Sequence, residues 1–443
     1  MFRMVGRRSA AALVMSGLLA LGAAACGDDD SDSGSSSSGG GSTSEAAPED
    51  SGAKAGDTTQ GAGVVDFQKY VGGTAGAADT SKSPIVIGWV NQQGGPADVG
   101  PGATKGAEMA VKYVNEELGG VEGHPIKLQT CCTSTSEEQG QSCGQKMAND
   151  KDISVVNVGA VAIGAQSLDS TVSSSKPMVY GVAIGASNAK NKTGFALFGN
   201  GVSVSAPFGT FVSEVLKAKS TAVVWPELPG INESSQAIVA SSKAAGLETK
   251  QVSWNPNATD LVGPLTAAGA QTADVIQANT DPKGCVNLAK ALASLKIDTP
   301  VVSEPLCLNP DVAKALGDTP RWTYGIASSL ATDTTDPAVA AYLKVAEKYG
   351  LGTASGDNWI PVAFAQIMTT VQWMNKIGAD AITPDALIEQ GRAFKGPLLW
   401  GPPTIECGKY PDMPAVCNDQ TKFYDYEGKG KLTVASGWLG PPS

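Results

Sequence analysis

From residue 84 onward, short apolar runs alternate with longer segments in which apolar residues recur every three or four positions. The first apolar run, 84–90, reads PIVIGWV and has the length of a strand. After a loop rich in Gly and Pro, the segment 103–118 has helical spacing, and Gly119 and Gly120 supply a stop signal. The pattern therefore predicts a strand, a loop and a helix as the first repeating unit.

The same unit repeats along most of the remaining chain. Further strands are predicted over 126–131, 152–160, 177–183, 221–227, 249–255, 274–280 and 300–305. Helices are predicted over 137–150, from the loop at 159–167 to residue 173, and over 232–246, 260–271 and 285–296. Strands that alternate with helices indicate parallel sheets with helices on both faces, so the predicted fold class is α/β. The repeats fall into two halves, and about 360 residues exceed one ordinary core, so two similar lobes are expected.

Open parallel sheets bind ligands beyond the carboxyl ends of their strands. The loops that follow the predicted strands are therefore the candidate binding segments. Their sequences are NQQGG, GAVAIG and GVAIG in the first half, and WPELPG, NTDPKG and SEPL in the second half.

The segment before the first strand has a different character. Arg3, Arg7 and Arg8 precede an apolar stretch over 10–21, and three alanines then lead into Cys26. This is the plan of a secretory signal, and a cysteine directly after the small residues is typical of a bacterial lipoprotein signal. We predict a signal peptide over 1–25 and lipidation of Cys26, which would anchor the protein at the outer face of the cell membrane. An ordinary signal followed by a chance cysteine is the alternative.

The stretch that follows Cys26 is made almost entirely of Ser, Gly and Asp. Such a composition cannot bury apolar surface and remains a solvated coil. We therefore assign 26–83 to the lipidated cysteine and a disordered tether. Residues 360–378 are the most apolar stretch of the later chain, but their amides and a lysine predict a core helix rather than a membrane span.

Charge and cysteine content narrow the possible functions. The net charge is −11 and no basic cluster is present, which argues against nucleic acid as a partner. Seven of the eight cysteines remain after Cys26, and they cluster so that local pairs would close three small loops and leave one thiol over. A metal site is the alternative, but the only histidine is His124 and no CxxC spacing occurs, so zinc is not expected.

Catalytic and cofactor motifs are missing from the sequence. His124 sits in a Gly/Pro turn, and neither a GxSxG elbow nor a GxxxxGK[ST] loop nor a GxGxxG after a strand is present. We predict that the protein is not an enzyme and uses no cofactor. An exported enzyme is retained only as a minor alternative.

The motifs of the first half resemble those of the type I periplasmic binding proteins, in the branch that binds branched-chain amino acids. The helix from Gly106 to Asn115 matches the family's G-x-x-x-A-h-x-x-x-N pattern (h is apolar), and the turn from Gly119 to Ile126 matches GG-h-x-G-x-P-I. The resemblance runs from about Pro84 to the C-terminus. It implies two Rossmann-like lobes, joined by three hinge crossovers, that close on a small ligand in a central cleft.

The resemblance also implies the domain limits and the partners. Lobe one would comprise 84–200 and 330–398, and lobe two 201–328 and 400–443, with crossovers near 199–203, 326–331 and 398–402. The protein would be a monomeric solute-binding lipoprotein that delivers its ligand to an ABC permease. A ligand-sensing receptor component of the same fold is the alternative.

Actinobacterial members of this branch suggest a cysteine pairing. The pairs would be Cys131–Cys143, Cys285–Cys307 and Cys407–Cys417, and Cys132 would be the unpaired thiol.

The lobe-one loops depart from the family's amino acid site. The family's two hydroxyl positions fall at Ala162 and Gly185, and an intervening backbone contact falls at Ala183. Both hydroxyls are missing, although backbone N–H groups at helix starts could still hold an anion. A ligand without a free α-amino acid head is therefore a real possibility.

The lobe-two loops keep only part of the pattern. One family tyrosine aligns near Gly230 and another near Thr280, while the family's acidic residue corresponds to Glu304. Further candidate ligand contacts are Trp225, Gln92 and Gln93, with Glu227, Asp281 and Trp359 as weaker ones. Each has a plain structural alternative: a solvated carboxylate for Glu304, core packing for Trp225 and a solvated turn for the glutamines.

Overall fold

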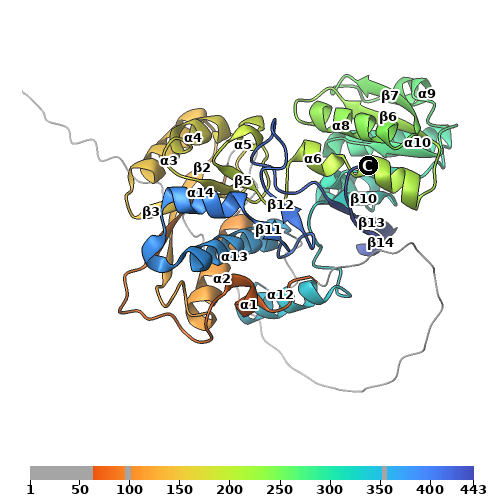
Figure 1. Cartoon of the computed structure of the whole chain (residues 1–443). Helices are drawn as coiled ribbons and strands as arrows, with labels where there is room; N and C mark the ends of the chain where they lie inside the picture. Colours follow the sequence, from red (N-terminus) through yellow and green to blue (C-terminus); the bar gives the residue numbers. More distant parts are fainter. Residues whose placement is uncertain (1–62, 95–100, 352–356) are drawn as a thin grey trace, which may run out of the picture.

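The computed structural model describes residues 63–94, 101–351 and 357–443. These residues form two lobes that lie side by side and are connected by crossing chain segments (Figure 1). Each lobe is built around its own sheet, and the sheets have five and seven strands. The two-lobed α/β architecture predicted from the sequence is confirmed.

The sheet of lobe one is entirely parallel and has the order β2-β1-β3-β4-β5. Its strands are β1 (Ile85–Gln92), β2 (Ile126–Thr133), β3 (Ile153–Val158), β4 (Met178–Tyr180) and β5 (Gly194–Ala196). Four of the five agree with predicted strands to within three residues at either end. The strand β5 is short, and the sequence analysis did not predict it.

Successive side chains along the strands of lobe one point to opposite faces of the sheet, and apolar residues on both faces explain why helices cover both. On β1, Ile87 and Trp89 point into one apolar cluster, whereas Val86 and Val90 lie against the other. One face is covered by α1 (Phe67–Val71), α2 (Gly102–Glu117), α12 (Pro337–Lys348), α13 (Trp359–Ile377) and α14 (Pro384–Arg392). The other face is covered by α3 (Glu137–Asn149), α4 (Ala165–Val172) and α5 (Ala186–Lys190).

The helix α13 is the most deeply buried helix of lobe one. It packs against α2, and the close approach is possible because Gly106 has no side chain: a Cβ there would lie 2.1 Å from the carbonyl oxygen of Ile360. Among the described residues, no helix is long and apolar enough to cross a membrane. The prediction of a core helix over 360–378 is therefore confirmed.

Lobe two has the strand order β14-β13-β10-β9-β8-β6-β7. Its strands are β6 (Ser220–Pro226), β7 (Glu248–Trp254), β8 (Val275–Ala278), β9 (Val301–Ser303), β10 (Thr323–Ile326), β13 (Thr421–Gly428) and β14 (Lys431–Leu439). Its helices are α6 (Gly201–Ser205), α7 (Phe208–Thr210), a π-helix (Phe211–Val215), α8 (Ile231–Ala244), α9 (Val262–Ala267), α10 (Pro282–Leu295), a 3₁₀ turn (Pro305–Leu308) and α11 (Pro310–Leu316).

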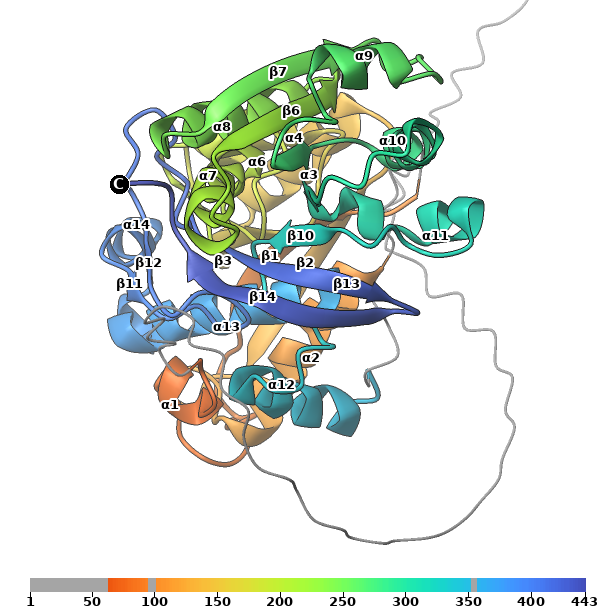
Figure 2. The ribbon, with the colours of Figure 1, turned by 90° about the vertical axis from the view of Figure 1, so that its right-hand side faces the viewer.

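The hairpin of β13 and β14 completes lobe two from the far end of the chain. Both of its pairings are antiparallel, and Figure 2 shows it lying alongside β10. Phe423 stacks on Phe211 with ring centroids 4.0 Å apart, which anchors the hairpin in the core of this lobe. The sequence analysis did not predict this hairpin, although it did assign the C-terminal residues to lobe two.

The chain passes between the lobes three times. The first passage follows β5 and leads through Asn200 into α6, and the second follows β10 and leads to α12. The third lies just before Thr421 at the start of β13, and not at 398–402 as expected, because the segment 395–417 packs on lobe one. That segment forms the short hairpin of β11 (Lys395–Gly396) and β12 (Ile405–Glu406), and Val416 bridges to Ala196 at the end of β5.

The beginning of lobe one also differs from expectation. The sequence analysis assigned residues 63–83 to the tether, but these residues belong to the described structure and include the helix α1. Phe67 and Val71 of α1 are buried in the lobe-one core, and Gln372 of α13 donates to the carbonyl oxygen of Tyr70. This short helix of five residues has too few positions to show a periodic pattern, so the polar composition around it dominated the prediction.

Candidate functional site

The carboxyl edges of both sheets lie beside the hinge. The strand β5 runs parallel to β4 and leads directly into the first passage, while β10 runs parallel to β9 and leads directly into the second. The loops at these edges therefore lie at the same end of each sheet as these passages, and Figure 1 shows β5 and α6 where the two lobes adjoin. We call them the interlobe loops: 91–94, 159–164 and 181–185 in lobe one, and 227–230, 279–281 and 304–309 in lobe two.

Gln92 organises the first of the lobe-one loops. Its side chain is fully buried, and its Oε1 accepts the backbone N–H groups of Ala162 and Ile163, each at 2.9 Å. A buried glutamine that accepts two backbone donors fixes a loop in one conformation, because breaking these bonds would leave polar groups unpaired. The backbone N–H groups of Ala162 and Ile163, in the loop where the sequence left open an anion site, are therefore already paired with Gln92.

The other predicted lobe-one residues are also engaged with the protein. Gln93 Oε1 accepts the hydroxyl of Thr104 at 3.0 Å. Ala183 is buried and its N–H donates to the carbonyl oxygen of Gly199, and the N–H of Gly185 donates to Oδ1 of Asn188. The structure thus brings these residues to the same edge of the sheet, but with their backbone donors already paired.

The side-chain carboxylate of Glu137, on α3, binds the start of α4, and the sequence analysis did not predict this contact. Glu137 accepts the N–H of Gly164 with Oε1 at 3.1 Å and the N–H of Ser167 with Oε2 at 3.0 Å. A hydrogen bond from the Ser167 side chain, and to a smaller extent these two backbone bonds, lower the pKa of Glu137. The helices approach this closely because Gly140 has no side chain: a Cβ there would lie 2.1 Å from the carbonyl oxygen of Gly164. An EE pair at a helix start was the available signal, but its target lies on another helix.

Glu304 is the distinctive group of lobe two. It directly follows β9, is partly buried, and its Oε1 lies 2.6 Å from the hydroxyl of Ser205 on α6. Burial raises the pKa of Glu304 to about 7, and the bond to Ser205 only partly opposes this effect.

The surroundings of Ser205 explain how a protonated Glu304 fits. The same Ser205 hydroxyl also lies 2.6 Å from the carbonyl oxygen of Gly201, and one hydroxyl has a single hydrogen to donate. A protonated Glu304 can donate to Ser205 while Ser205 donates to Gly201, which satisfies all three groups. Ser205 carries no sequence signal of its own and was not among the predicted residues.

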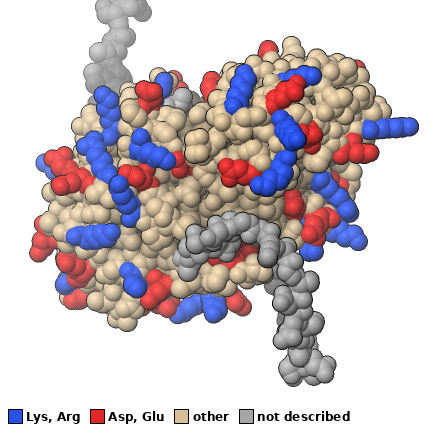
Figure 3. Space-filling view, turned by 45° about the vertical axis from the view of Figure 1, so that its right-hand side comes forward, with Lys and Arg blue, Asp and Glu red and all other residues tan. Residues whose placement is uncertain are grey.

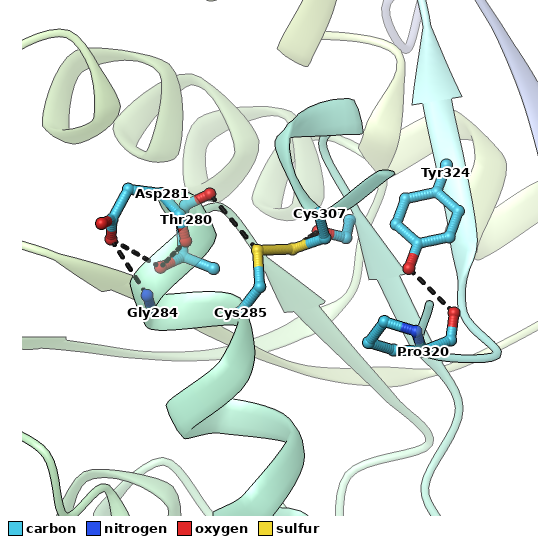
Figure 4. The surroundings of a disulfide bond; sticks show 8 residues. Thr280, Asp281, Gly284, Cys285, Cys307, Pro320 and Tyr324 are labelled. Carbon is cyan, nitrogen blue, oxygen red and sulfur yellow. Dashed lines mark hydrogen bonds between the residues drawn. A yellow bond between two sulfur atoms is a disulfide. The ribbon is translucent and has the colours of Figure 1, made fainter. Parts of the chain in front are cut away.

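A disulfide joins the Glu304 loop of lobe two to the helix α10, which follows the neighbouring interlobe loop. Figure 4 shows Cys285, just after the loop that contains Thr280 and Asp281, bonded to Cys307, three residues after Glu304. Thr280 is fully buried beside it, and Asp281 caps α10 by accepting the N–H of Gly284. The disulfide therefore couples the position of the Glu304 loop to that of α10.

Two predicted aromatic contacts have different surroundings. Trp225 is buried in the core of lobe two, and its Nε1 donates to Oδ1 of Asn232 at 3.0 Å, so core packing describes it better than a ligand contact. Trp359 begins α13 and is only half-buried. Its neighbour Asn358 bridges the second passage by donating to Ser328 at 2.6 Å.

The remaining cysteine predictions have mixed outcomes. The bonds Cys131–Cys143, Cys285–Cys307 and Cys407–Cys417 are present, as the family resemblance implied. The expectation of an unpaired thiol at Cys132 is wrong, because no cysteine in the described part of the chain is free. Cys26 lies outside the described residues.

Neither a metal site nor a surface hollow adds a second candidate site within the described part of the chain. Among residues 63–94, 101–351 and 357–443, no group of three or more His, Cys, Asp or Glu side chains could hold a metal ion. Three open hollows of about 440 to 530 Å³ lie on lobe one, and none is lined by an interlobe loop.

Comparisons with known proteins agree with this arrangement. The model of a family described as periplasmic binding protein matches residues 84–410, whereas a comparison with curated proteins gives no match. A leucine-binding protein from Thermotoga maritima has a TM-score of 0.62 at 14% identity, covering 81% of this chain and 99% of that one.

Two further solved structures have the same fold. A solute-binding protein from R. palustris in complex with 4-hydroxybenzoate has a TM-score of 0.62 at 16% identity, with 82% and 98% of the chains covered. A fatty acid ABC transporter substrate-binding protein from Thermomonospora curvata has a TM-score of 0.59 at 16% identity, with 83% and 95% covered. Since the family model spans most of both lobes and these structures share their architecture, the chain belongs to the periplasmic binding protein family and has its type I fold.

Proposed function

We propose that the protein is an extracytoplasmic solute-binding protein of an ABC importer, which holds a small molecule between its lobes and presents it to a membrane permease. The observation that carries the proposal is the family match across both lobes. The interlobe loops support it, because they follow the carboxyl ends of parallel strands, where open α/β sheets bind ligands. Proteins of this fold bind compounds as different as leucine and 4-hydroxybenzoate, so the fold alone leaves the ligand open.

Closure of the lobes on the ligand is part of this proposal. Gln92, Gln93, Ala162, Ala183 and Gly185 would form the lobe-one wall. Glu304 would supply the polar contact of lobe two, with the buried Thr280 and Trp225 shaping the wall behind it. A ligand that contacts the interlobe loops of both lobes favours the closed arrangement of the lobes over the open one.

The first test is a thermal-shift screen of the full-length chain against small molecules, followed by uptake measurements. A ligand at a hundred times its Kd should stabilise the protein by about 2.7 kcal/mol, which is a readily measured rise in Tm. Cells without the protein should then lose uptake of the compound found. Absence of any stabilising compound, or unchanged uptake, would contradict the proposal.

The binding role of Glu304 is tested on the same ligand. Glu304→Ala should weaken its binding at least tenfold, which corresponds to about 1.4 kcal/mol. The exposed Glu248→Ala on β7 is the matched control and should bind normally. Equal affinities for both variants would remove Glu304 from the site.

We also propose that Cys26 carries the lipid that anchors the protein to the membrane, with the Ser/Gly/Asp-rich segment as its tether. Cys26→Ser should release the protein from the membrane fraction and abolish its partitioning into detergent. The neighbouring Ser31→Ala serves as the control and should stay membrane-bound. Continued partitioning of the Cys26→Ser protein would rule out the anchor.

A further inference from the structure

The polar groups of the lobe-one wall are already paired within the protein. Gln92 takes the N–H groups of Ala162 and Ile163, and Asn188 takes the N–H of Gly185. A ligand carboxylate that displaced these acceptors would have to leave a buried glutamine or asparagine oxygen without a donor. Such an exchange gains little, because one set of hydrogen bonds is only replaced by another.

The start of α4 already binds an anion of the protein itself. The first N–H groups of a helix attract negative charge, but here the Glu137 carboxylate already binds two of them. A second carboxylate placed there would meet a like charge. Lobe one therefore has its own carboxylate at the start of α4, where the helix would otherwise favour the anionic group of a ligand.

The charges of the interlobe loops point in the same direction. Within the described interlobe loops there is no Lys, Arg or His, while Glu227, Asp281 and Glu304 all belong to the lobe-two loops. The basic residue nearest in sequence to any of these loops is Lys283, which is exposed on the first turn of α10. Figure 3 shows much of the surface between the lobes as uncharged. An anion brought into this region would lose its hydration without gaining a positive partner from the loops.

Apolar side chains are exposed in one interlobe loop of each lobe. Ile184, after β4, is 41% exposed, and Leu306, after β9, is 45% exposed. Six large apolar side chains of the described residues are exposed, and Ile184 and Leu306 are the two of them that lie in interlobe loops. Together they offer an apolar contact to a ligand from both lobes.

We propose that this site selects a small, largely apolar molecule whose head group is a hydrogen-bond donor, either an amine or a neutral group such as a hydroxyl or amide, and that it rejects ligands with a carboxylate. This inference rests on the proposed function and specifies its ligand class. Ile184 and Leu306 contact the apolar part, and Glu304 receives the donor. The paired donors of lobe one and the Glu137 carboxylate exclude the acid.

The test is a set of matched compounds offered to the full-length chain. Branched alkyl, straight alkyl and arylalkyl skeletons of increasing length are each presented as amine, alcohol, amide, carboxylate and α-amino acid. We expect Tm to rise with amines, alcohols or amides, and the carboxylate and amino acid of the same skeleton to bind at least tenfold more weakly in calorimetry. A carboxylate or amino acid that binds as tightly as its neutral or amine counterpart overturns the inference but leaves solute binding intact. No binding in any class overturns both.

A pair of variants tests the reason for the rejection. Glu137→Gln removes the internal charge from the start of α4, and Glu138→Gln removes a charge from the same helical turn, on a side chain with no bond to α4. We expect the affinity for the carboxylate compounds, relative to their amine counterparts, to rise at least threefold in Glu137→Gln and to stay unchanged in Glu138→Gln. An unchanged ratio in both variants would overturn the role assigned to Glu137.

Discussion

The interlobe loops of the two lobes differ in how their polar side chains are paired. In lobe one, Gln92 and Glu137 bind backbone N–H groups, so the loops are held in place before any ligand arrives. In lobe two, Glu304 is partly buried with Ser205 as its hydrogen-bond partner and has a pKa raised to about 7. The difference suggests a rigid, apolar wall in one lobe and a chemically responsive group in the other.

The junction between the lobes should show the largest effect. Lys422 on β13 is 3% exposed and pairs with Asp333 at 2.5 Å and with Asp336 at 3.7 Å, and both aspartates precede α12 of lobe one. Replacing the lysine by methionine leaves a buried carboxylate without its partner, which costs about 3–5 kcal/mol. We therefore expect Lys422→Met to lower the free energy of unfolding by this amount in urea titrations.

Two further variants identify the cause of that loss. Lys431→Met removes an exposed partner of Glu427 and should change stability by less than about 1 kcal/mol. Adding Asp333→Asn to Lys422→Met should recover part of the loss, because the unpaired charge is removed. No recovery would mean that lost packing, and not the charge, is responsible.

The disulfide of lobe two should come next in size. Cys285–Cys307 closes a loop with a sequence separation of 22 residues, so Cys285→Ala with Cys307→Ala should lower stability by about 3 kcal/mol. Because the bond positions the Glu304 loop, the double variant should also weaken ligand binding. The matched pair Cys131→Ala with Cys143→Ala in lobe one should lose stability without a comparable loss of affinity. Equal losses of affinity would contradict the division of roles between the lobes.

The carboxyl of Glu304 predicts a pH dependence. Its pKa is about 7 in the folded protein, and the ordinary pKa of a glutamate, 4.5, applies when the chain is unfolded, so the folded state holds the proton more tightly. Its contribution to stability is therefore fully present below pH 4.5 and is lost as the pH rises through about 7. We expect wild type to lose about 3 kcal/mol relative to Glu304→Gln between these pH values, with a slope of at most about 1.4 kcal/mol per pH unit.

Urea titrations at a series of pH values measure this difference. The exposed Glu248→Gln provides the control curve and should run parallel to wild type. A Glu304→Gln curve that also runs parallel to wild type would show that Glu304 is solvated in both states, which was the plain alternative raised by the sequence.

These regions also show what the sequence could and could not predict. The strands and helices of the alternating part were predicted closely because period 2 and period 3.6 are local signals, as in β1 and α13. The hairpin of β13 and β14 was missed, since its place beside β10 depends on a pairing about a hundred residues away along the chain.

The sequence placed the candidate residues after the correct strands, but it could not show how their polar groups are paired, and their role in binding stays a prediction. The family alignment and the strand ends located Ala162, Gly185 and Glu304 at the correct edges of the sheets. The sequence could not reveal that Gln92 binds the Ala162 N–H, because the two residues are 70 positions apart. The raised pKa of Glu304 likewise comes from its burial beside Ser205, which only the folded chain brings within reach.

The smallest effect tests the lobe-one wall directly. Gln92→Leu keeps the buried volume roughly similar but removes the acceptor for Ala162 and Ile163, and we expect a loss of about 1–2 kcal/mol in urea titrations. The loss is modest because Ala162 is exposed, so water can reach the freed donors. The same donors become available to a ligand carboxylate, so leucine should bind this variant more tightly than wild type. Gln251→Leu on the exposed face of β7 should leave both quantities unchanged. If Gln92→Leu also leaves both unchanged, the lobe-one wall does not depend on its internal hydrogen bonds, and the contrast between the lobes reduces to Glu304 alone.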